Sequence, residues 1–466
     1  MKQIRDPYFL LIIGGGAAGI YISSFLKNKK NVLLIESGSK TNYSSNDPKN
    51  NFMIKGNYEN GRRARGLGGT TNLWGGQMLP FSEQDISKKN NWPFEWQDLF
   101  KNYQSVSNNL FGDNYFSEQI KNSNFNVPTP KLNNSLLYVH HSRWLKEPNF
   151  KKLLKPKYKN KIESIFNSTV KFIEKTNDKN YLVTYETNQK DIFKIKAKNI
   201  VIATGTIETN RLLLMCEKYK KLILPKNLGK GFMDHLSIPI CQLKPKNRFR
   251  FLKKFNTRYL NNGKKYSVRI SASEEFYKAN KSLNISSGIQ ISEPKKFWQN
   301  LINLFSAFLS TKIFGVVIKP FGKINLNLIL EQRSLFSRSI TLNNNDIPLI
   351  TWKKNKEEAN LAAHFSNIII DQLYSEKLLH ERPKIPTLET ICRNLKDVNH
   401  PMGGVQMHKN KSSSLVTSDL QLKGYKNLYI CSGAVFTSGS HSNPTMTLLA
   451  LADRLTKKLN QKRESK

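Results

Sequence analysis

The stretch Phe9-Leu-Leu-Ile-Ile-Gly-Gly-Gly-Ala-Ala-Gly19 decides the fold. Its apolar run leads directly into glycines with GxGxxG spacing at Gly14, Gly16 and Gly19, and a helical pattern covers Ala17–Phe25. In such a unit the first glycine permits a tight turn, the second lets the backbone approach a pyrophosphate, and the third lets the helix pack on the strand. The helix N-terminus offers unpaired N–H groups to phosphates. The stretch therefore predicts a dinucleotide-binding βαβ unit.

A carboxylate stands at the end of the next predicted strand. The apolar stretch Asn31–Ile35 leads to Glu36 and Ser37. An acid about twenty residues after the glycines accepts hydrogen bonds from an adenosine ribose and disfavours a 2′-phosphate. NAD and FAD both satisfy this pattern, so other parts of the chain must distinguish them.

Length and composition predict a globular protein of two intertwined domains. The chain has 466 residues, of which 38% are hydrophobic, which excludes wholesale disorder. The formal net charge is +40, but lysines are scattered, without an arginine-rich stripe or a recognisable nucleic-acid module. We therefore expect no nucleic-acid partner. Attraction to anionic substrates, or peripheral contact with an anionic membrane surface, stays open.

Cysteine spacing and the apolar runs bear on metal sites, disulfides and membrane contact. The four cysteines include no CxxC pair, so we expect no metal site and no disulfide scaffold. The N-terminal apolar run does not resemble a signal peptide, which favours a cytoplasmic enzyme, with contact at the inner face of the membrane left open. The apolar stretch Leu301–Ile318 is interrupted by Ser306, Ser310 and Lys312, and predicts a buried or interfacial helix.

A second strand–helix junction favours a flavin. We expect strands over Thr169–Glu174, Tyr181–Glu186, Ile192–Lys196 and Ile200–Ala203. The last of these runs into Thr204 and Gly205, and a helix then opens with Thr206 and Glu208. A strand that returns to the same dinucleotide after a β-meander is typical of flavoproteins. An ordinary strand–helix junction is the alternative.

The loop Gly66-Leu-Gly-Gly-Thr-Thr-Asn-Leu-Trp-Gly-Gly76 is the densest glycine cluster. Such density indicates backbone passing close to phosphates or to a large flat group. Arginines precede the loop, including Arg65, and Thr70, Thr71 and Asn72 offer hydrogen-bonding groups. A flexible loop is the alternative, although Trp74 argues against pure flexibility.

Two histidines in C-terminal turns are candidates for acid–base chemistry. His400 lies in Asn399-His-Pro-Met-Gly-Gly404, and His441 lies in Thr437-Ser-Gly-Ser-His-Ser-Asn-Pro-Thr-Met-Thr447. A neutral histidine is a suitable general base near neutral pH, and the carboxamide of Asn443 is suited to hold an alcohol oxygen. Either histidine alone is more often structural.

Taken in order, these motifs resemble the glucose–methanol–choline (GMC) family of FAD-dependent oxidoreductases, and most closely its sugar- and polyol-oxidising branch. The resemblance is carried by Gly14–Gly19 with Glu36, Gly66–Gly76, Ala203–Arg211, Asn227–His235, His400–Gly404 and Asn427–Thr447. It implies an α/β fold with a Rossmann-like FAD-binding domain over 1–85, 155–240 and 388–466. An α+β substrate-binding domain, an antiparallel sheet with helices, would be inserted over 86–154 and 241–387.

The resemblance also implies a mechanism and a set of site residues. His400 would help remove the hydroxyl proton of a sugar, polyol or other alcohol while a hydride passes to flavin N5, with Asn443 and His441 as companions. Leu73 aligns with a histidine that binds FAD covalently in some members, so we expect non-covalent FAD. Gly404-Val-Gln-Met407 departs from the usual Thr-Cys-Arg-Met and loses a cation. The expected cofactor-binding residues are Gly14, Gly16, Ala17, Ala18, Gly19, Glu36, Ser37, Arg65, Gly68, Gly69, Thr70, Thr71, Asn72, Leu73, Trp74, Gly75, Val170, Ala203, Thr204, Gly205, Glu208, Ser432, Gly433, Asn443, Pro444 and Thr445.

Several alternatives stay open at the level of sequence. A flavin-dependent monooxygenase or an NAD-linked enzyme would share the opening GxGxxG motif. A non-catalytic flavin-binding membrane partner, or an isomerase that uses a flavin, would share further motifs of the flavin site as well. The substrate, the electron acceptor, and the choice between dehydrogenase and oxidase are open, although we favour a dehydrogenase. Candidates for the substrate pocket are His140, His141, Arg143, Trp144, Glu331, Gln332 and Arg338.

Overall fold

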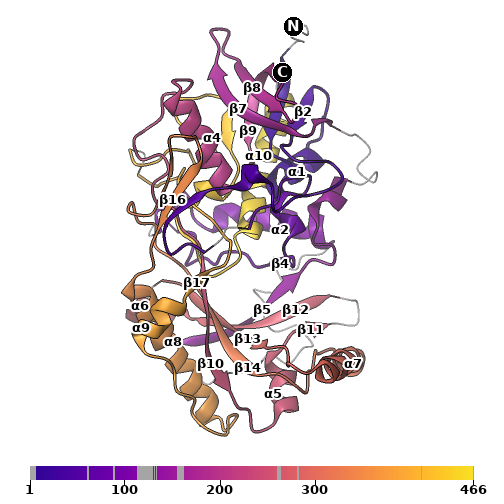
Figure 1. The fold of residues 1–466 in the computed structure, drawn as a ribbon, viewed down its shortest axis with the longest axis vertical. Coiled ribbons are helices and arrows are strands. Elements are labelled where there is room, and N and C mark those ends of the chain that lie inside the picture. The colour runs from indigo at the N-terminus through magenta and orange to yellow at the C-terminus, as the bar shows by residue number, and fades with distance from the viewer. Residues whose placement is uncertain are drawn as a thin grey trace.

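The computed structural model divides the chain between two large sheets, each with its own hydrophobic core (Figure 1). It describes residues 7–59, 62–87, 90–112, 130, 132, 134–154, 162–259, 264–280, 283–410 and 412–464. The first sheet lies with both termini in the upper half of Figure 1, and the second sheet lies below it. Part of the predicted segment 86–154 therefore falls outside the described residues.

The first sheet is parallel at its centre and carries an antiparallel meander. Its order is β6-β2-β1-β9-β8-β7, and β18 also pairs with β9. Ile13 pairs with Ile35 on one side and with Ile202 on the other, so three strands end at the same edge. The strands are β1 (Tyr8–Ile13), β2 (Val32–Ile35), β6 (Glu163–Ile165), β7 (Ser168–Lys175), β8 (Tyr181–Thr187), β9 (Ile192–Ile202) and β18 (Leu428–Ile430).

One strand is longer than the sequence pattern predicts. The expected strands Ile192–Lys196 and Ile200–Ala203 form the single strand β9. Its first half pairs with β8 and its second half with β18, while β1 runs along its other side. At the junction the Asn199 side chain donates to the carbonyl of Phe9 at 2.7 Å. The strand therefore continues through residues 197–199 and changes its neighbour from β8 to β18, which explains why the sequence pattern changes there although the strand does not end.

Four helices pack around the first sheet, and one of them comes from a segment expected in the substrate-binding domain. Leu99, Tyr103 and Val106 of α2 are buried in the first core at helical spacing, and the Asn102 side chain donates to Asp453 at 2.8 Å. The prediction that this part of 86–154 belongs with the second sheet is thus corrected. These helices are α1 (Ala17–Phe25), α2 (Gln97–Phe111), α4 (Thr206–Lys218) and α10 (Thr445–Glu464).

The second sheet is antiparallel, in the order β17-β10-β14-β13-β12-β5-β4, with β11 paired to β12. Its buried residues alternate along β14 with half-buried ones, as expected for a sheet with one face on a core. The predicted antiparallel sheet with helices is therefore confirmed. Its strands are β4 (Gln77–Met78), β5 (Leu137–Trp144), β10 (Leu236–Leu243), β11 (Arg258–Tyr259), β12 (Lys265–Ala272), β13 (Ile285–Ile291), β14 (Ile324–Leu330) and β17 (Lys396–Asp397).

The remaining elements cover the second sheet and connect it to the first. A small sheet of β15 (Ser339–Leu342), β16 (Pro348–Trp352) and β3 (Met53–Gly56) lies between them (Figure 1). Helix α8 (Lys356–Ser375) begins with a capping box of Asn355 and Glu358. The other helices are α5 (Arg248–Phe255), α6 (Glu274–Asn280), α7 (Phe297–Phe314) and α9 (Leu388–Asn394), with short 3-10 turns η1 (Pro48–Asn50), η2 (Gly69–Asn72), η4 (Phe150–Leu154) and η5 (Gly433–Val435).

Among the described residues, no helix combines the length and the apolar character needed to span a membrane.

Candidate active site

The loops that follow the parallel strands of the first sheet line one cavity of about 540 Å³. The turn after β1 is tied to both neighbours, since Gly14 N–H donates to the carbonyl of Ile35 and Ala203 N–H donates to that of Ile13, each at 2.8 Å. Open α/β sheets bind ligands in the crevice beyond the carboxyl ends of their strands. The cavity occupies this crevice.

The glycines of the first turn leave room for a phosphate group. A Cβ on Gly19 would lie 1.9 Å from the carbonyl oxygen of Gly14, and a Cβ on Gly14 would lie 2.6 Å from that of Ala203. By contrast, the nearest atom to a Cβ on Gly16 would be 4.0 Å away, so this position opens into the cavity. No side chain caps the start of α1. Its first N–H groups therefore fit a pyrophosphate.

Glu36 joins this turn to the glycine-rich loop. Its Oε2 accepts from Gly15 N–H at 2.7 Å, and its Oε1 accepts from Gly38 N–H at 2.8 Å and Gly66 N–H at 3.1 Å. The carboxylate is buried and lines the cavity. Because each carboxylate oxygen accepts more than one hydrogen bond, the same group retains acceptor capacity for a ribose hydroxyl.

The glycine-rich loop is ordered by its own polar side chains. Thr71 Oγ1 donates to Gly68 at 2.6 Å, Asn72 Nδ2 donates to Gly69 at 2.8 Å, and Asn149 Nδ2 donates to Asn72 Oδ1 at 2.7 Å. These bonds hold η2 against the cavity wall, with Gly69, Thr70 and Thr71 in the lining.

Most of the predicted site residues line this cavity, and six do not. The six outside the lining are Gly19, Gly68, Asn72, Gly75, His441 and Asn443. Of these, Gly19 packs within α1 against the turn, Asn72 bonds within the glycine-rich loop, and Gly75 packs against Trp144. The predicted residues in the lining are Gly14, Gly16, Ala17, Ala18, Glu36, Ser37, Arg65, Gly69, Thr70, Thr71, Leu73, Trp74, Val170, Ala203, Thr204, Gly205, Glu208, His400, Ser432, Gly433, Pro444 and Thr445.

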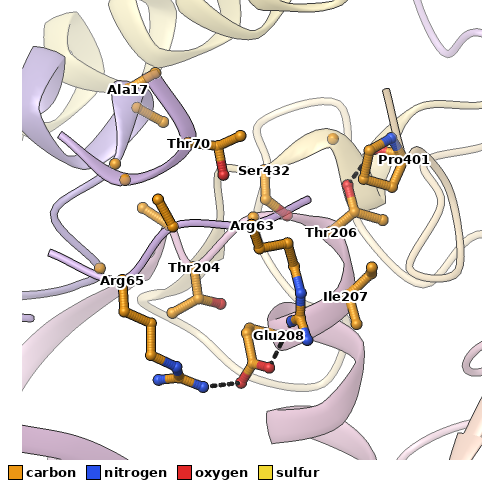
Figure 2. Close-up of a pocket in the computed structure, with 18 of the residues that line it drawn as sticks. Ala17, Arg63, Arg65, Thr70, Thr204, Thr206, Ile207, Glu208, Pro401 and Ser432 are labelled. Atoms are coloured by element: carbon orange, nitrogen blue, oxygen red, sulfur yellow. Dashed lines mark hydrogen bonds and ion pairs between the residues drawn. The ribbon is translucent and has the colours of Figure 1, made fainter. Parts of the chain in front are cut away.

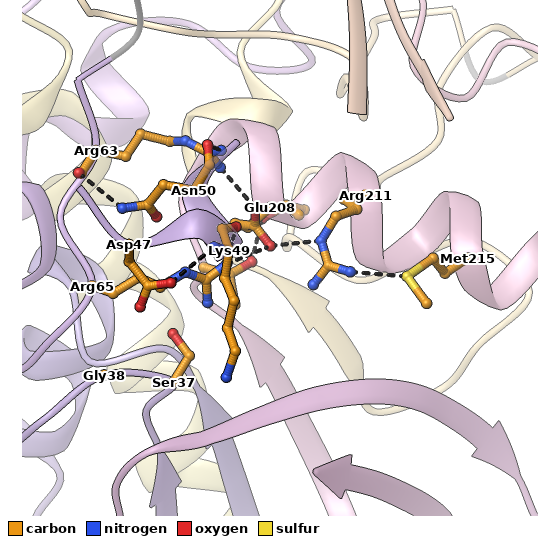
Figure 3. Close-up of polar contacts among 12 residues, drawn as sticks. Ser37, Gly38, Asp47, Lys49, Asn50, Arg63, Arg65, Glu208, Arg211 and Met215 are labelled. Atoms are coloured by element: carbon orange, nitrogen blue, oxygen red, sulfur yellow. Dashed lines mark hydrogen bonds and ion pairs between the residues drawn. The ribbon is translucent and has the colours of Figure 1, made fainter. Parts of the chain in front are cut away.

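A cluster of three arginines surrounds Glu208 at the start of α4 (Figures 2 and 3). Glu208 pairs with Arg63 at 2.7 Å, with Arg211 at 2.8 Å and with Arg65 at 3.6 Å. Burial favours the protonated acid, but the guanidinium groups of Arg211, Arg63 and Arg65 outweigh it and hold the pKa of Glu208 well below its usual range.

This cluster leaves cationic hydrogen-bond donors at the cavity. Arg63 Nε and Arg65 Nε are buried, and no described residue accepts from either atom. A buried donor without an acceptor is costly, so these atoms point to an anionic or oxygen-rich ligand. Sequence reasoning assigned Arg65 to the cofactor site but gave Arg63 and Arg211 no role there, because their importance depends on the fold bringing α4 beside the arginines that precede the glycine-rich loop.

The loop that carries His400 is fixed by a buried acid. His400 N–H donates to Asp234 Oδ1 and the Tyr58 hydroxyl donates to Asp234 Oδ2, both at 2.9 Å. Burial, together with the nearby Asp397 carboxylate, raises the pKa of Asp234 to about 8. Asp234, just before the start of β10, thus sets the position of the His400 backbone from more than 160 residues earlier in the chain.

Hydrogen bonding selects one tautomer of His400. His235 Nε2 lies 2.9 Å from the carbonyl oxygen of Gly439, so this nitrogen carries a proton. Burial lowers the pKa of His235 to about 4, which leaves its Nδ1 unprotonated at neutral pH. His400 Nδ1 lies 2.9 Å from that atom and must be the donor. The proton-free nitrogen of His400 is therefore Nε2.

Burial also keeps His400 neutral. It lowers the pKa of the imidazole well below the usual histidine value, with smaller contributions from His235 and Arg269. A neutral imidazole with a free Nε2, in the wall of the cavity, is an available proton acceptor.

His441 and Asn443 lie outside the cavity lining and contact strands of the second sheet. His441 Nε2 is 3.2 Å from Ser271 Oγ, which in turn is 2.7 Å from His140 Nε2. His441 Nδ1 is buried, with no hydrogen-bond partner among the described residues. Asn443 Nδ2 donates to the carbonyl of Gln77 at 3.4 Å. The two side chains thus border on the second sheet, where the substrate-binding domain is expected.

A pair of buried acids holds the loop of His441. Glu331 Oε1 accepts from Gly439 N–H at 3.0 Å, and Asp85 Oδ2 accepts from the Ser440 hydroxyl at 2.7 Å. Burial and the Asp85 carboxylate raise the pKa of Glu331 to about 7. Glu331, a sequence candidate for the substrate pocket, thus anchors this loop.

The other substrate-pocket candidates make internal contacts. Arg338 pairs with the buried Glu358 at 2.6 Å, and Gln332 Oε1 accepts from Trp352 Nε1 at 2.6 Å. The Arg143 guanidinium lies 4.1 Å from the ring centre of Phe111. Trp144, His140 and His141 belong to β5, whose full length pairs with β12.

Sequence reasoning also gave no role to Tyr58, Asp234 and His235. The last two stand at the end of the motif Asn227–His235, which supported the family resemblance but suggested no role for either side chain. Within the described ranges, no three histidine, cysteine, aspartate or glutamate side chains are arranged to hold a metal ion.

Comparison with known proteins agrees with this geometry. Residues 354–452 match a family model described as GMC oxidoreductase, C-terminal. No curated protein matches the chain. Among solved structures, pyridoxine 4-oxidase from Mesorbium loti superposes with a TM-score of 0.64 at 15% identity, over 96% of this chain and 98% of that one.

Structures of formate oxidase show a similar degree of structural likeness to this chain. One of them superposes with a TM-score of 0.63 at 14% identity, over 99% of this chain and 100% of that one. An Aspergillus oryzae RIB40 formate oxidase variant, described for its FAD modification, has a TM-score of 0.63 at 13% identity and the same coverage. The predicted resemblance is confirmed over residues 354–452, which match the GMC oxidoreductase model, and the chain takes the fold of these oxidases.

Proposed function

We propose that this protein is an FAD-dependent oxidoreductase that oxidises the CH–OH group of a sugar, a polyol or another alcohol. The observation that carries the proposal is the neutral His400, which lines the cavity and whose Nε2 is free of a proton. The GMC oxidoreductase domain over residues 354–452 supplies this histidine, which supports the same class of reaction.

FAD fits the residues of the cavity. The open position at Gly16 and the uncapped start of α1 suit its pyrophosphate, and Glu36 suits its ribose. Arg63 and Arg65 offer unpaired donors beside it. Leu73 has no nucleophilic atom, so we propose non-covalent binding. When bound, FAD supplies the two-electron acceptor for the hydride of the carbinol carbon.

The protein's own residues handle the proton. His400 Nε2 accepts the proton of the substrate hydroxyl, and the resulting imidazolium keeps its Nδ1–H bond to His235. His235 is a positioning residue because it selects the tautomer, and Asp234 is another because it fixes the backbone of His400. Asn443 is proposed to hold the alcohol oxygen, and His441 to stabilise negative charge on the pyrimidine side of the cofactor.

Pyridoxine 4-oxidase and formate oxidase act on different small molecules, and each shares only the fold with this chain. All four cysteines are free. Occasional free cysteines suit a reducing compartment, and we therefore propose a cytoplasmic enzyme.

An absorption spectrum of the purified protein tests the proposal. We expect a flavin spectrum, release of the flavin into the supernatant on acid precipitation, and bleaching when one of several pools of sugars and alcohols is added without oxygen. Bleaching should persist until an acceptor is supplied, which separates oxidation of the substrate from an isomerase cycle. A colourless protein that takes up no FAD would contradict the proposal.

A further inference from the structure

Helix α7 exposes an apolar side of unusual size. Phe305 is 69% exposed and Phe308 is 64% exposed. Large contiguous apolar patches are rare on the surface of monomeric proteins and mark interaction sites. The exposed apolar side chains of α7 are Phe297, Trp298, Leu301, Ile302, Leu304, Phe305, Phe308, Leu309, Ile313 and Phe314.

The polar side of α7 faces the protein. Asn303 Oδ1 accepts from Phe321 N–H and Ser310 Oγ accepts from Ile318 N–H, both at 3.0 Å, while the Ser306 hydroxyl donates to Ile318 at 3.1 Å. Asn303 and Ser310 are the buried residues of the helix. A surface helix of a water-soluble protein has the opposite arrangement, with its apolar stripe on the core. The helix is thus fixed to the body with its apolar side outward.

Helix α5 extends this surface and adds positive charge. The rings of Phe249 and Phe314 lie 5.3 Å apart, and Lys253 Nζ lies 5.2 Å from the ring centre of Phe314. Buried Phe251 and Phe255 anchor α5 to the second core. In Figure 1 both helices lie at the end of the molecule away from the first sheet.

The sequence around both helices contains no acidic residue. Residues 236–273 and 294–330 include neither aspartate nor glutamate. Lysines stand at both ends of α7, at Lys295 and Lys296 before it and at Lys312 within its last turn. The combination is an apolar side bordered by cations, which is the pattern of a helix that lies in the plane of an anionic membrane surface.

We propose that α7 and α5 dock this protein on the surface of a bilayer that contains anionic phospholipids. The apolar side chains would enter the boundary between headgroups and acyl chains, and the lysines would contact lipid phosphates. A second copy of the chain fits less well, because a twofold interface would bring two acid-free, lysine-rich surfaces together. Neither helix lines the candidate active-site cavity.

Flotation of the purified full-length protein with vesicles tests the proposal. We expect binding to vesicles of phosphatidylcholine with phosphatidylglycerol, and much weaker binding to phosphatidylcholine alone. The double substitution Phe305→Gln and Phe308→Gln should weaken binding by about tenfold or more, because two large rings lose their insertion. Both side chains are already in solvent, so the fold should persist, as circular dichroism would verify.

A matched control removes exposed apolar side chains elsewhere. Ile223 is 90% exposed and Phe336 is 63% exposed, and neither belongs to α5 or α7. Ile223→Gln with Phe336→Gln should leave vesicle binding unchanged. A Trp298→Phe variant should lose the blue shift of fluorescence that vesicles induce.

Two results would overturn the proposal. The first is equal binding by the Phe305→Gln, Phe308→Gln protein and its control, or no preference for anionic vesicles. The second is a dimer, measured by mass photometry, that the same double substitution dissociates while vesicles recruit no protein. Neither result depends on flavin content, so docking and the proposed reaction fail or succeed separately.

Discussion

The two walls of the cavity are built in different ways. The wall beneath α1 is mostly backbone: glycines with local spacing, a helix start and one carboxylate. The opposite wall is made of side chains, since His400 depends on Asp234, His235 and Tyr58 from distant parts of the chain. Substitutions on the first wall should therefore change cofactor binding, and substitutions on the second should change chemistry while the cofactor stays bound.

The largest expected effect is that of His400→Ala. Removal of the proton acceptor should lower kcat with the alcohol substrate by about 10²–10⁴-fold, the usual contribution of a general base. The flavin content should stay the same, because the glycine wall is untouched. Steady-state kinetics and the flavin-to-protein absorbance ratio measure both quantities.

A second histidine provides the control for this substitution. His380 is exposed on the segment after α8, so His380→Ala should keep full activity. If His400→Ala retained wild-type kcat, or lost its flavin in proportion to its activity, His400 would not be the base.

Substitution of Gly16 by valine probes the other wall. The added side chain would enter open cavity space, and overpacking there should cost about 1–3 kcal/mol of cofactor binding, or about fivefold to 150-fold in Kd. Titration of the apoprotein with FAD measures this change. Gly19→Ala is the contrasting variant, because its Cβ would lie 1.9 Å from Gly14 oxygen and should lower the melting temperature instead. Equal FAD affinity in Gly16→Val and wild type would show that the cofactor does not approach this turn.

The difference between the walls also explains what the sequence could predict. Glycine spacing is a local property of the sequence. Short motifs therefore predict the βαβ unit, the sheet edge shared by Ile13 and Ile35, and most residues of the cavity. The bond from His400 to Asp234 joins residues 166 positions apart, and no local pattern indicates it. Asn443 and His441 are adjacent to predicted cavity residues but face the second sheet.

The helices outside the site illustrate the same limit. The apolar run 301–318 predicts a buried or interfacial helix, but only tertiary contacts decide which side of α7 faces water. Segment 86–154 has no clear period, and the packing of α2 against α10 depends on Asp453 near the other end of the chain.

Replacement of His235 should have a smaller effect than loss of His400, because the base remains. In His235→Ala the acceptor for His400 Nδ1–H is absent, so the tautomer with a free Nε2 is no longer selected. We expect kcat to fall by about tenfold, less than for a missing base. His235→Asn should restore part of the activity, because its side-chain oxygen can accept the same hydrogen bond.

The pH profile distinguishes this role from a merely structural one. His235 contributes to the low pKa of His400. Its removal should therefore raise the pKa of His400 and move the acid limb of kcat/KM to higher pH. An unchanged acid limb with reduced kcat would indicate that His235 only supports packing.

The last expected effect concerns the pH dependence of stability at the buried Asp234. Its pKa rises from 3.8 to about 8 on burial, so the folded protein binds a proton that the unfolded chain releases between these values. The contribution of Asp234 to the free energy of unfolding is fully present below pH 3.8 and is lost as the pH rises through 8. Asp234→Asn, which has no proton to lose, should make the free energy of unfolding less dependent on pH across this window. Urea unfolding at pH 5 and pH 8.5 measures the difference between variant and wild type. His235 and Tyr58 are present in both proteins, so their titrations cancel in the difference between variant and wild type. If the free energy of unfolding depended on pH identically in the variant and the wild type, Asp234 would be ionised in the folded protein and would hold the His400 loop as a charged acceptor.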